Sequence, residues 1–226
     1  WMTSRRWTSY LRGGFLCLDY NGTIDNTKDD LSTFRYGAYN QDGAFCDFSQ
    51  AAYAMMEDDD GAIWLGTDAG LFVVSDPDTW SSPDFRITQI KVPRNDGTNY
   101  ADYLLSGVAV TAITRDGAGR KWIGTSGNGL YLVNRDGTEI ISHFTADNSP
   151  LLSNDIYSVA VAATTGEVMI ATRLGLCSYQ SDASLPSDNL VRKNIKVYPN
   201  PVRPEHAAGV VISGLTAEAD VKVTTA

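Results

Sequence analysis

The fold is decided by the stretch Asp60-Gly61-Ala62-Ile63-Trp64-Leu65-Gly66-Thr67-Asp68-Ala69-Gly70-Leu71, because this pattern recurs along the chain. A second copy runs from Gly119 to Leu130, with Trp122 in the place of Trp64. A weaker third copy runs from Gly166 to Leu176 and carries Met169 instead of the tryptophan. At the start of the chain, a gap-free alignment places a degraded copy with Trp7 as its tryptophan. The four anchors are Trp7, Trp64, Trp122 and Met169, and the repeat therefore has a period of roughly 50 residues.

Each repeat predicts four short β-strands. An apolar segment, Val108–Ile113 or Ile156–Val161, leads through an Asp/Gly turn into the strand that carries the tryptophan. A Thr-x-x-Gly turn follows, then a strand that opens with Gly-Leu, and a looser segment closes the unit. Four strands in roughly 40–50 residues is the size of a propeller blade. The first copy lacks its opening strand, so we expect about three and a half blades in residues 1–181.

The tryptophan strand reads as a continuous apolar run, Ile63-Trp64-Leu65, rather than as an alternation. We therefore expect it to be interior to its blade and covered on both faces by neighbouring blades. Gly66 and Gly124 would let the next blade approach closely. Positive φ is expected at the hairpin glycines, which are Gly70, Gly129 and Gly175.

Two dipeptides in which Asn or Asp precedes Gly also predict hairpin turns, namely Asn21-Gly22 and Asp136-Gly137. Asn21-Gly22-Thr23 also fits a glycosylation acceptor. Its counterpart in the repeat, Asp136-Gly137-Thr138, makes the same turn without an asparagine, which favours the turn.

The composition limits the classes of function. The 226 residues include 18 Lys plus Arg and 27 Asp plus Glu, a net charge of −9, which argues against nucleic acid as a partner. No apolar run approaches the roughly 20 residues that span a bilayer. The three cysteines have neither zinc spacing nor the numbers of a disulfide framework, and we expect them to be small apolar residues.

The repeat pattern, Asp-x-x-Gly-x-x-Trp-x-Gly-Thr-x-x-Gly-Leu, resembles the two-component-regulator propeller repeats of surface and sensor proteins in Bacteroidetes-type bacteria. The second and third of the four copies along the chain match well, and the last has lost its Trp and its Gly. The resemblance implies an all-β fold built from propeller blades over residues 1–181.

The chain changes character after the repeats. Residues 182–194 are polar and predict a linker. Residues 195–226 begin with Ile195-Lys196-Val197-Tyr198-Pro199-Asn200-Pro201 and continue into two alternating segments, Gly209–Leu215 and Ala219–Val223. An Ig-like sandwich needs about seven strands, so this segment predicts the truncated start of such a domain.

The Val-Tyr-Pro-Asn-Pro run resembles the C-terminal domain of proteins handled by the type IX secretion system. Joined to propeller repeats, it resembles the family of the propeller component of the type IX surface attachment complex. That resemblance implies a retained C-terminal domain, binding of anionic lipopolysaccharide and its transfer to a sortase. Members of that family have two full propellers and a complete C-terminal domain, and this chain covers only part of each.

A local reversal of charge agrees with an anionic ligand. Residues 189–204 contain four basic side chains and no acidic one, within an acidic chain, a charge that would suit an anionic head group; the alternative is a soluble linker that happens to be basic. These candidate contacts are Arg192, Lys193, Lys196 and Arg203.

A second set of candidate contacts follows from topology. In a four-stranded blade, the loop between the second and third strands lies on the same face as the loop between successive blades. The first kind of loop carries Arg12, Asp68, Ser126, Asn128 and Arg173, and the second carries Asn154 and Asp155. The alternative is that all seven are solvated turn residues.

Catalytic and metal sites find little support in the sequence. Gly124-Thr125-Ser126-Gly127-Asn128 approaches a nucleophile elbow, but its last glycine is Asn and no strand-to-helix context surrounds it. Glu57-Asp58-Asp59-Asp60-Gly61 invites a calcium interpretation, yet the following strand breaks the EF-hand pattern. We interpret that acidic run as a solvated turn and expect no enzyme activity, no cofactor and no metal.

The sequence therefore predicts a non-enzymatic, exported binding and scaffold protein of the outer-membrane surface. Its expected partners are the sortase, other attachment-complex proteins and anionic lipopolysaccharide or another glycan. One alternative is a periplasmic, oligosaccharide-sensing ectodomain of a hybrid two-component system; the other is a secreted cargo protein whose tail is only an export signal. Because three and a half blades do not close a ring, we expect poor solubility or self-association of this segment.

Overall fold

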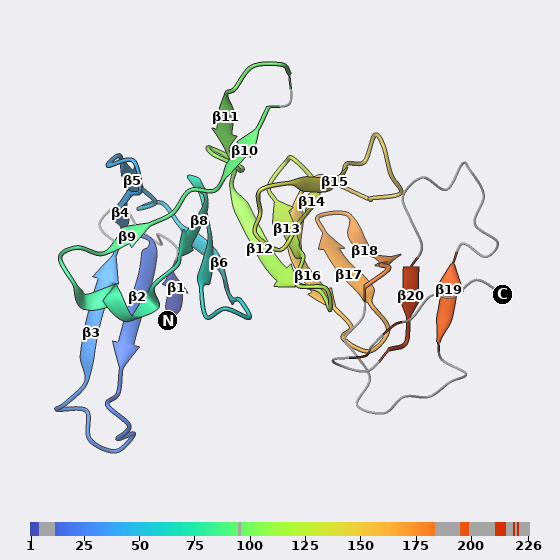
Figure 1. Cartoon of the computed structure of the whole chain (residues 1–226). Coiled ribbons are helices and arrows are strands. Elements are labelled where there is room, and N and C mark those ends of the chain that lie inside the picture. Colours follow the sequence, from blue (N-terminus) through green and yellow to red (C-terminus); the bar gives the residue numbers. More distant parts are fainter. Residues whose placement is uncertain are drawn as a thin grey trace.

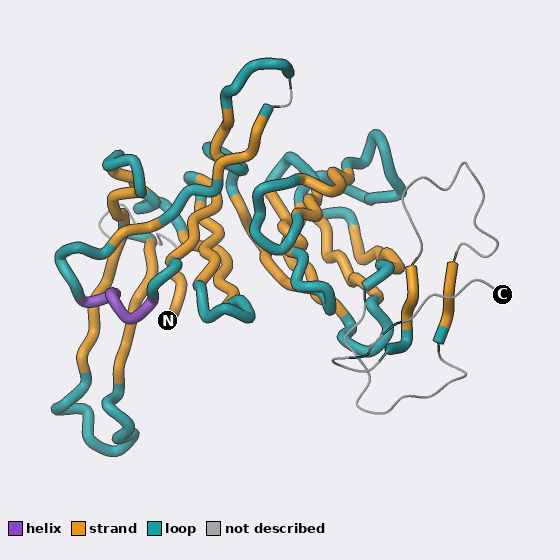
Figure 2. Tube along the Cα trace, viewed as in Figure 1, coloured by secondary structure: helices purple, strands orange, loops and turns teal. Residues whose placement is uncertain are grey.

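The computed structural model describes residues 1–4, 12–94, 96–183, 195–198, 211–215, 219 and 221. Its described part is all-β apart from one short 3-10 helix, η1 (Pro77–Ser81), which confirms the predicted fold class (Figures 1 and 2). Four antiparallel sheets follow one another along the chain. The first sheet contains β1 (Met2–Ser4), β2 (Gly14–Asp19) and β3 (Leu31–Arg35); the second contains β6 (Ala52–Glu57), β7 (Ile63–Thr67) and β8 (Gly70–Val74). The third contains β12 (Val110–Arg115), β13 (Lys121–Thr125), β14 (Leu130–Val133) and β15 (Ile140–Phe144); the fourth contains β16 (Ile156–Val161), β17 (Glu167–Thr172) and β18 (Gly175–Gln180).

The sheets stand side by side as propeller blades do. The leading strands β6, β12 and β16 lie next to one another, and the second strand of each sheet contacts the leading strand of the next (Figure 1). β1 contacts β6 in the same way. The first sheet thus begins at the position of a second strand, and the prediction that it lacks an opening strand is confirmed for the described residues.

The predicted count of four strands per unit holds for the third sheet alone among the described residues. In the second sheet, Thr88 makes a single bridge to Val73 where the fourth strand was expected. The fourth sheet has the order β16-β17-β18, and no fourth strand follows β18 among the described residues. The predicted strand over 156–161 is confirmed, whereas the one expected over 108–113 begins and ends two residues later.

The tryptophan of the first sheet is Trp1, and the prediction of Trp7 is wrong. β1 pairs Met2 with Leu16 and Ser4 with Gly14, as β13 pairs with β14, so Trp1 takes the position of Trp122. The Trp1 ring stacks on Phe15 at 5.3 Å between centroids. Trp7 lies outside the described residues. The alignment failed because the loop after β1 is longer than the loop after β13.

The close approach of neighbouring sheets explains two glycines of the motif. A Cβ at Gly66 would lie 2.7 Å from Val110 of the third sheet, and a Cβ at Gly124 would lie 2.5 Å from Ile156 of the fourth. All residues of β7 and β13 are buried, as predicted for strands covered on both faces. β17 instead alternates between buried and partly buried residues.

The threonine of the motif has a role that the sequence did not reveal. Its hydroxyl donates a hydrogen bond to the carbonyl of the hairpin glycine in three sheets, at 3.0, 2.7 and 2.9 Å. The three pairs are Thr67–Gly70, Thr125–Gly129 and Thr172–Gly175. Each glycine has positive φ (130°, 78° and 139°), as predicted.

The core consists of three clusters, each shared by two consecutive sheets. Phe15 and Leu65 belong to the cluster between the first and second sheets. Trp64 and Ile123 belong to the next, and Trp122 lies between the third and fourth sheets. Each interface therefore has its own apolar core, in which a tryptophan of one sheet meets the aliphatic residues of the following sheet.

Two insertions decorate this frame. The hairpin of β4 (Gly37–Asn40) and β5 (Phe45–Asp47) pairs in parallel with β9 (Arg86–Ile87) and so joins the first and second sheets. The buried amide of Asn40 donates to the side-chain oxygen of Gln89 at 2.8 Å and secures this contact. The hairpin of β10 (Lys91–Pro93) and β11 (Ala101–Tyr103) projects between the second and third sheets (Figure 1).

The predicted turns differ from each other. Asn21 and Gly22 both have positive φ, 51° and 72°, as a type I′ turn requires. At the second turn, Gly137 has φ 73° whereas Asp136 does not have positive φ. The turn interpretation of Asn21-Gly22 is confirmed, within a loop that extends to Leu31.

The tail contributes one strand pair, β19 (Lys196–Tyr198) with β20 (Val211–Ser213). β20 is the centre of the segment expected over 209–215. Ala219 and Val221 are not in a strand, and the rest of the segment predicted over 219–223 lies outside the described residues. The domain boundaries at 181 and 195 stay a prediction.

Candidate functional site

Four of the predicted contact residues meet at the junction of the third and fourth sheets. The Ser126 hydroxyl donates to Asp155 Oδ1 at 3.3 Å, and Arg173 lies 3.8 Å from the other carboxylate oxygen. The Asn154 carbonyl accepts hydrogen bonds from the backbone of Gly127 and Gly129, at 3.2 and 2.9 Å. The topological argument is thus correct in bringing the two kinds of loop together. Binding of a ligand by these residues stays a prediction.

The other residues of this set make contacts of their own. The Arg12 guanidinium lies 4.1 Å above the Tyr36 ring. Asp68 accepts the Ala51 backbone N–H at 3.1 Å, so it caps the entry into its own sheet. Asn128 is exposed, and its carbonyl lies 2.7 Å from His143 Nε2.

The basic residues of the tail fall mostly outside the described residues, namely Arg192, Lys193 and Arg203. Lys196 is described as the exposed first residue of β19, opposite Ser213.

The acidic run 57–60 leads into a turn in which Glu57, Asp59 and Asp60 are exposed, as predicted, whereas Asp58 is buried against the third sheet. Asp58 lies 2.5 Å from the ammonium of Lys121 in the third sheet, and both side chains are buried, with 7% and 0% exposed. Lys121 also donates to the Arg135 carbonyl and lies 4.7 Å from the centre of the Trp64 ring. The carboxylate therefore has a cation from the next sheet as its partner, which accounts for it without calcium.

The remaining carboxylates of the run face the third sheet as well. Asp59 pairs with Arg115, and Asp60 lies 3.1 Å from Arg135. Burial alone raises the pKa of the Asp58 carboxyl. The hydrogen bond and charge of Lys121, with the N–H groups of Asp59 and Trp64, outweigh that effect and hold this pKa below its ordinary value.

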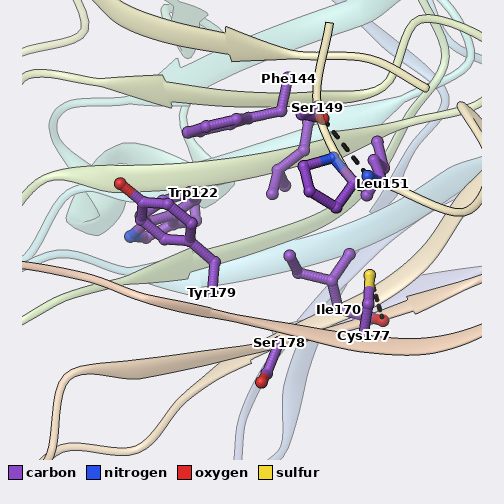
Figure 3. A pocket seen from close by; sticks show the side chains of 10 residues that line it. Trp122, Phe144, Ser149, Leu151, Ile170, Cys177, Ser178 and Tyr179 are labelled. Carbon is purple, nitrogen blue, oxygen red and sulfur yellow. Dashed lines mark hydrogen bonds between the residues drawn. The ribbon is translucent and has the colours of Figure 1, made fainter. Parts of the chain in front are cut away.

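A cavity of about 150 Å³ lies between the third and fourth sheets (Figure 3). Trp122 and Phe144 of the third sheet stack at 5.9 Å, and Tyr179 of β18 lies within 5.7 Å of both rings. The rest of the cavity wall is formed by Leu130, Ser149, Pro150, Leu151, Ile170, Cys177 and Ser178. No single motif in the sequence marked this cavity, because its wall combines two sheets with the loop at residues 149–151.

The three cysteines are free thiols. Cys17 is 1% exposed, and burial raises its pKa to about 11. Cys46 and Cys177 are partly buried.

The chemistry of the loop junction suits hydrogen bonding to a polar ligand. The Ser126 hydroxyl has Asp155 as its partner, and His143 contacts the Asn128 carbonyl rather than Ser126. Within the described residues, no group of three His, Cys, Asp or Glu side chains has metal-binding geometry.

Comparison with known proteins supports the repeat assignment. Residues 48–69 match the family model described as "Two component regulator propeller". A solved structure of PorZ, described as an essential bacterial surface component of the type-IX secretion system of Porphyromonas gingivalis, is 34% identical over 94% of this chain, with a TM-score of 0.74. This chain spans 28% of that structure's length.

Two other solved structures are extracellular domains of putative hybrid two-component systems from B. thetaiotaomicron. BT3049 is 22% identical over 80% of this chain and 24% of its own, with a TM-score of 0.47. BT4673 is 17% identical over 65% of this chain and 22% of its own, with a TM-score of 0.45. A search of curated proteins returned no match. None of the helices in the described residues is long and apolar enough to span a membrane.

Proposed function

We propose that this chain is the propeller portion of a surface component of a type IX secretion system, which binds anionic lipopolysaccharide without catalysis and presents it to the sortase. The observation that carries the proposal is the similarity to PorZ, at 34% identity over 94% of this chain. The Tyr-Pro-Asn-Pro run at residues 198–201 and the basic residues around it support the same assignment.

The surface distribution of charge determines where the ligand would bind. The chain carries a net charge of −9, so an anionic glycolipid needs a local region of the opposite sign. The tail provides Arg192, Lys193, Lys196 and Arg203 in such a region. At the loop junction, Arg173 is 68% exposed but stands beside Asp155, so that pair offers no net positive charge.

The test is binding of purified anionic lipopolysaccharide to the chain at low and raised salt. A variant with the four tail cations changed to Gln should lose at least about tenfold in affinity at low salt, because attraction between opposite charges, which added salt weakens, provides the binding free energy. Lys28→Gln, an exposed cation on the β2–β3 loop, is the matched control and should bind as the unchanged chain does.

Three other outcomes would overturn the proposal. Equal affinities of the tail variant and the control for lipopolysaccharide would show that the tail is not the binding site. Binding of a neutral oligosaccharide that Arg173→Gln abolishes, without lipopolysaccharide binding, would favour the sensing ectodomain. Cleavage in the segment before Ile195 in the native host would favour a secreted cargo protein.

A further inference from the structure

The chain is fastened to the sheets directly after β18. Residues 181–183, which we call the exit segment, lie on the turn between β16 and β17. The Ser181 backbone N–H donates to the Gly166 carbonyl at 3.1 Å, and Ser181 is only 7% exposed. A Cβ at Gly166 would lie 2.4 Å from the Ala183 carbonyl oxygen. The exit segment is therefore packed tightly against the fourth sheet.

Arg120, in the turn between β12 and β13, also holds the exit segment. Its Nη2 donates to the Ser181 hydroxyl at 2.9 Å and to Asp182 Oδ1 at 2.6 Å. Its Nε donates at 2.8 Å to Asp116 Oδ2, and the Asp116 side chain is completely buried. The guanidinium thus lies between two carboxylates, one in its own turn and one in the exit segment. Because the guanidinium is planar, the bond to Asp116 fixes the direction of the other two.

The turn itself does not require an arginine. In the second sheet, the position of Arg120 is occupied by Ala62, whose carbonyl accepts the Asp58 backbone N–H at 2.8 Å. The Arg120 carbonyl accepts the Asp116 N–H in the same way, at 3.0 Å. The corresponding residue of the fourth sheet is Glu167. Among these three copies, arginine therefore occurs only in the turn that contacts the exit segment.

These contacts determine the end of the sheets from which the tail leaves. β13 begins at Lys121, next to Arg120, and ends at Thr125, next to Ser126. Arg120 and Ser126 consequently lie at opposite ends of the same strand. The exit segment is held at the end opposite the loop junction, where Ser126 meets Asp155.

We propose that Arg120 acts as a latch for the tail. By holding Ser181 and Asp182, it keeps the exit segment packed on the third and fourth sheets and closes the peptide bonds of residues 181–183 to proteases. The latch does not depend on which ligand the tail binds. It places the start of the tail away from the loop junction, so a ligand of the junction would not compete with the tail for space.

The test measures hydrogen–deuterium exchange of the whole chain by mass spectrometry, in peptides that cover residues 178–183 and, as an internal reference, β13 and β17. Asp182→Asn removes the charge on the exit side and leaves Arg120 paired with Asp116. It should raise the exchange rate of the Ser181 amide about threefold, because a half-exposed ion pair is lost. Arg120→Gln removes both contacts with the exit segment and should raise that rate at least about fivefold.

The matched control is Arg115→Gln, which breaks an exposed pair with Asp59 in the same sheet and should leave the Ser181 amide unchanged. A protease that cleaves on the amino side of aspartate gives a second readout at the Ser181–Asp182 bond. Cleavage there should be at least about fivefold faster in Arg120→Gln than in this control.

Two results would overturn the proposal. One is an unchanged exchange rate of the Ser181 amide in both Asp182→Asn and Arg120→Gln. The other is faster exchange throughout β13 and β17 in Arg120→Gln with no effect of Asp182→Asn, because Arg120 would then stabilise only its own turn. Asp182→Asn keeps the test decisive if Arg120→Gln does not fold, since the buried Asp116 retains its cation in that variant.

Discussion

Removal of the buried Lys121 ammonium should destabilise the protein more than any exposed charge change. In Lys121→Met, the Asp58 carboxylate keeps its burial but loses its cation, and one of its oxygens already lacks a hydrogen-bond partner. Breaking a buried pair by removing one partner costs about 3–5 kcal/mol. Loss of the contact with the Trp64 ring adds to this cost. We therefore expect the free energy of unfolding to fall by at least about 3 kcal/mol.

The double variant distinguishes a specific pair from a general packing defect. Asp58→Asn alone leaves Lys121 buried with a carbonyl and an aromatic ring as partners. Asp58→Asn combined with Lys121→Met removes both charges, so it should cost less than the sum of the single variants, with a coupling of roughly 1–3 kcal/mol. Urea denaturation followed by tryptophan fluorescence provides the three free energies.

A matched control lies in the same turn. Asp60 and Arg135 form an exposed pair, with 71% and 51% of their side chains accessible, so Asp60→Asn should cost no more than about 1 kcal/mol. The reasoning is refuted if Lys121→Met costs no more than this control, or if the two single variants are additive.

The same pair predicts the response to pH. The pKa of Asp58 is lowered in the folded state, so the unfolded chain binds the proton more readily. The stability from this group is fully present above the ordinary carboxyl pKa of about 4 and is lost as the pH falls through the lower folded value. Asp58→Asn should flatten that part of the curve of stability against pH.

Three further variants and probes test other features. Gly124→Ala should destabilise by about 1–3 kcal/mol in urea titrations, because its Cβ would lie 2.5 Å from Ile156; a gain in stability would contradict the close contact. Thr125→Val should lower the free energy of unfolding by about 1–2 kcal/mol, because the 2.7 Å hydrogen bond to the Gly129 carbonyl is lost. Thr125→Ser keeps the hydroxyl and should lose much less stability; equal losses in the two variants would show that the hydroxyl does not stabilise the turn. Cys17, with a pKa of about 11, should react with a thiol reagent at pH 8 only after unfolding, and rapid labelling of the native chain at Cys17 would refute its burial.

The sequence predicted those parts of the fold that depend on short-range pattern. The repeat identified the tryptophan strands, and the glycine pattern identified both the tight turns and the close contacts at Gly66 and Gly124. The first copy was aligned on Trp7 because a gap-free match cannot register a loop that changes length; strand pairing places Trp1 there.

Contacts between sheets were harder to predict. The acidic run 57–60 has its cationic partners more than 50 residues further on, and no local pattern links Asp58 to Lys121. The signal was nevertheless present, because a lysine directly before the tryptophan appears only in the copy that follows the acidic turn. The loop junction was predicted in part, since topology alone brings Ser126 towards Asp155.

The buried Asp58–Lys121 pair also determines which blade can follow which. In the copies anchored on Trp64 and Met169, the residue before the anchor is Ile63 and Val168, so neither sheet could neutralise a buried Asp58. The counterpart of Asp58 in the third sheet, Asp116, obtains its cation from Arg120 of its own turn instead. The boundary between the second and third sheets therefore requires one particular neighbour, and replacing the third sheet by a copy of the second or fourth would leave the Asp58 charge buried without a partner.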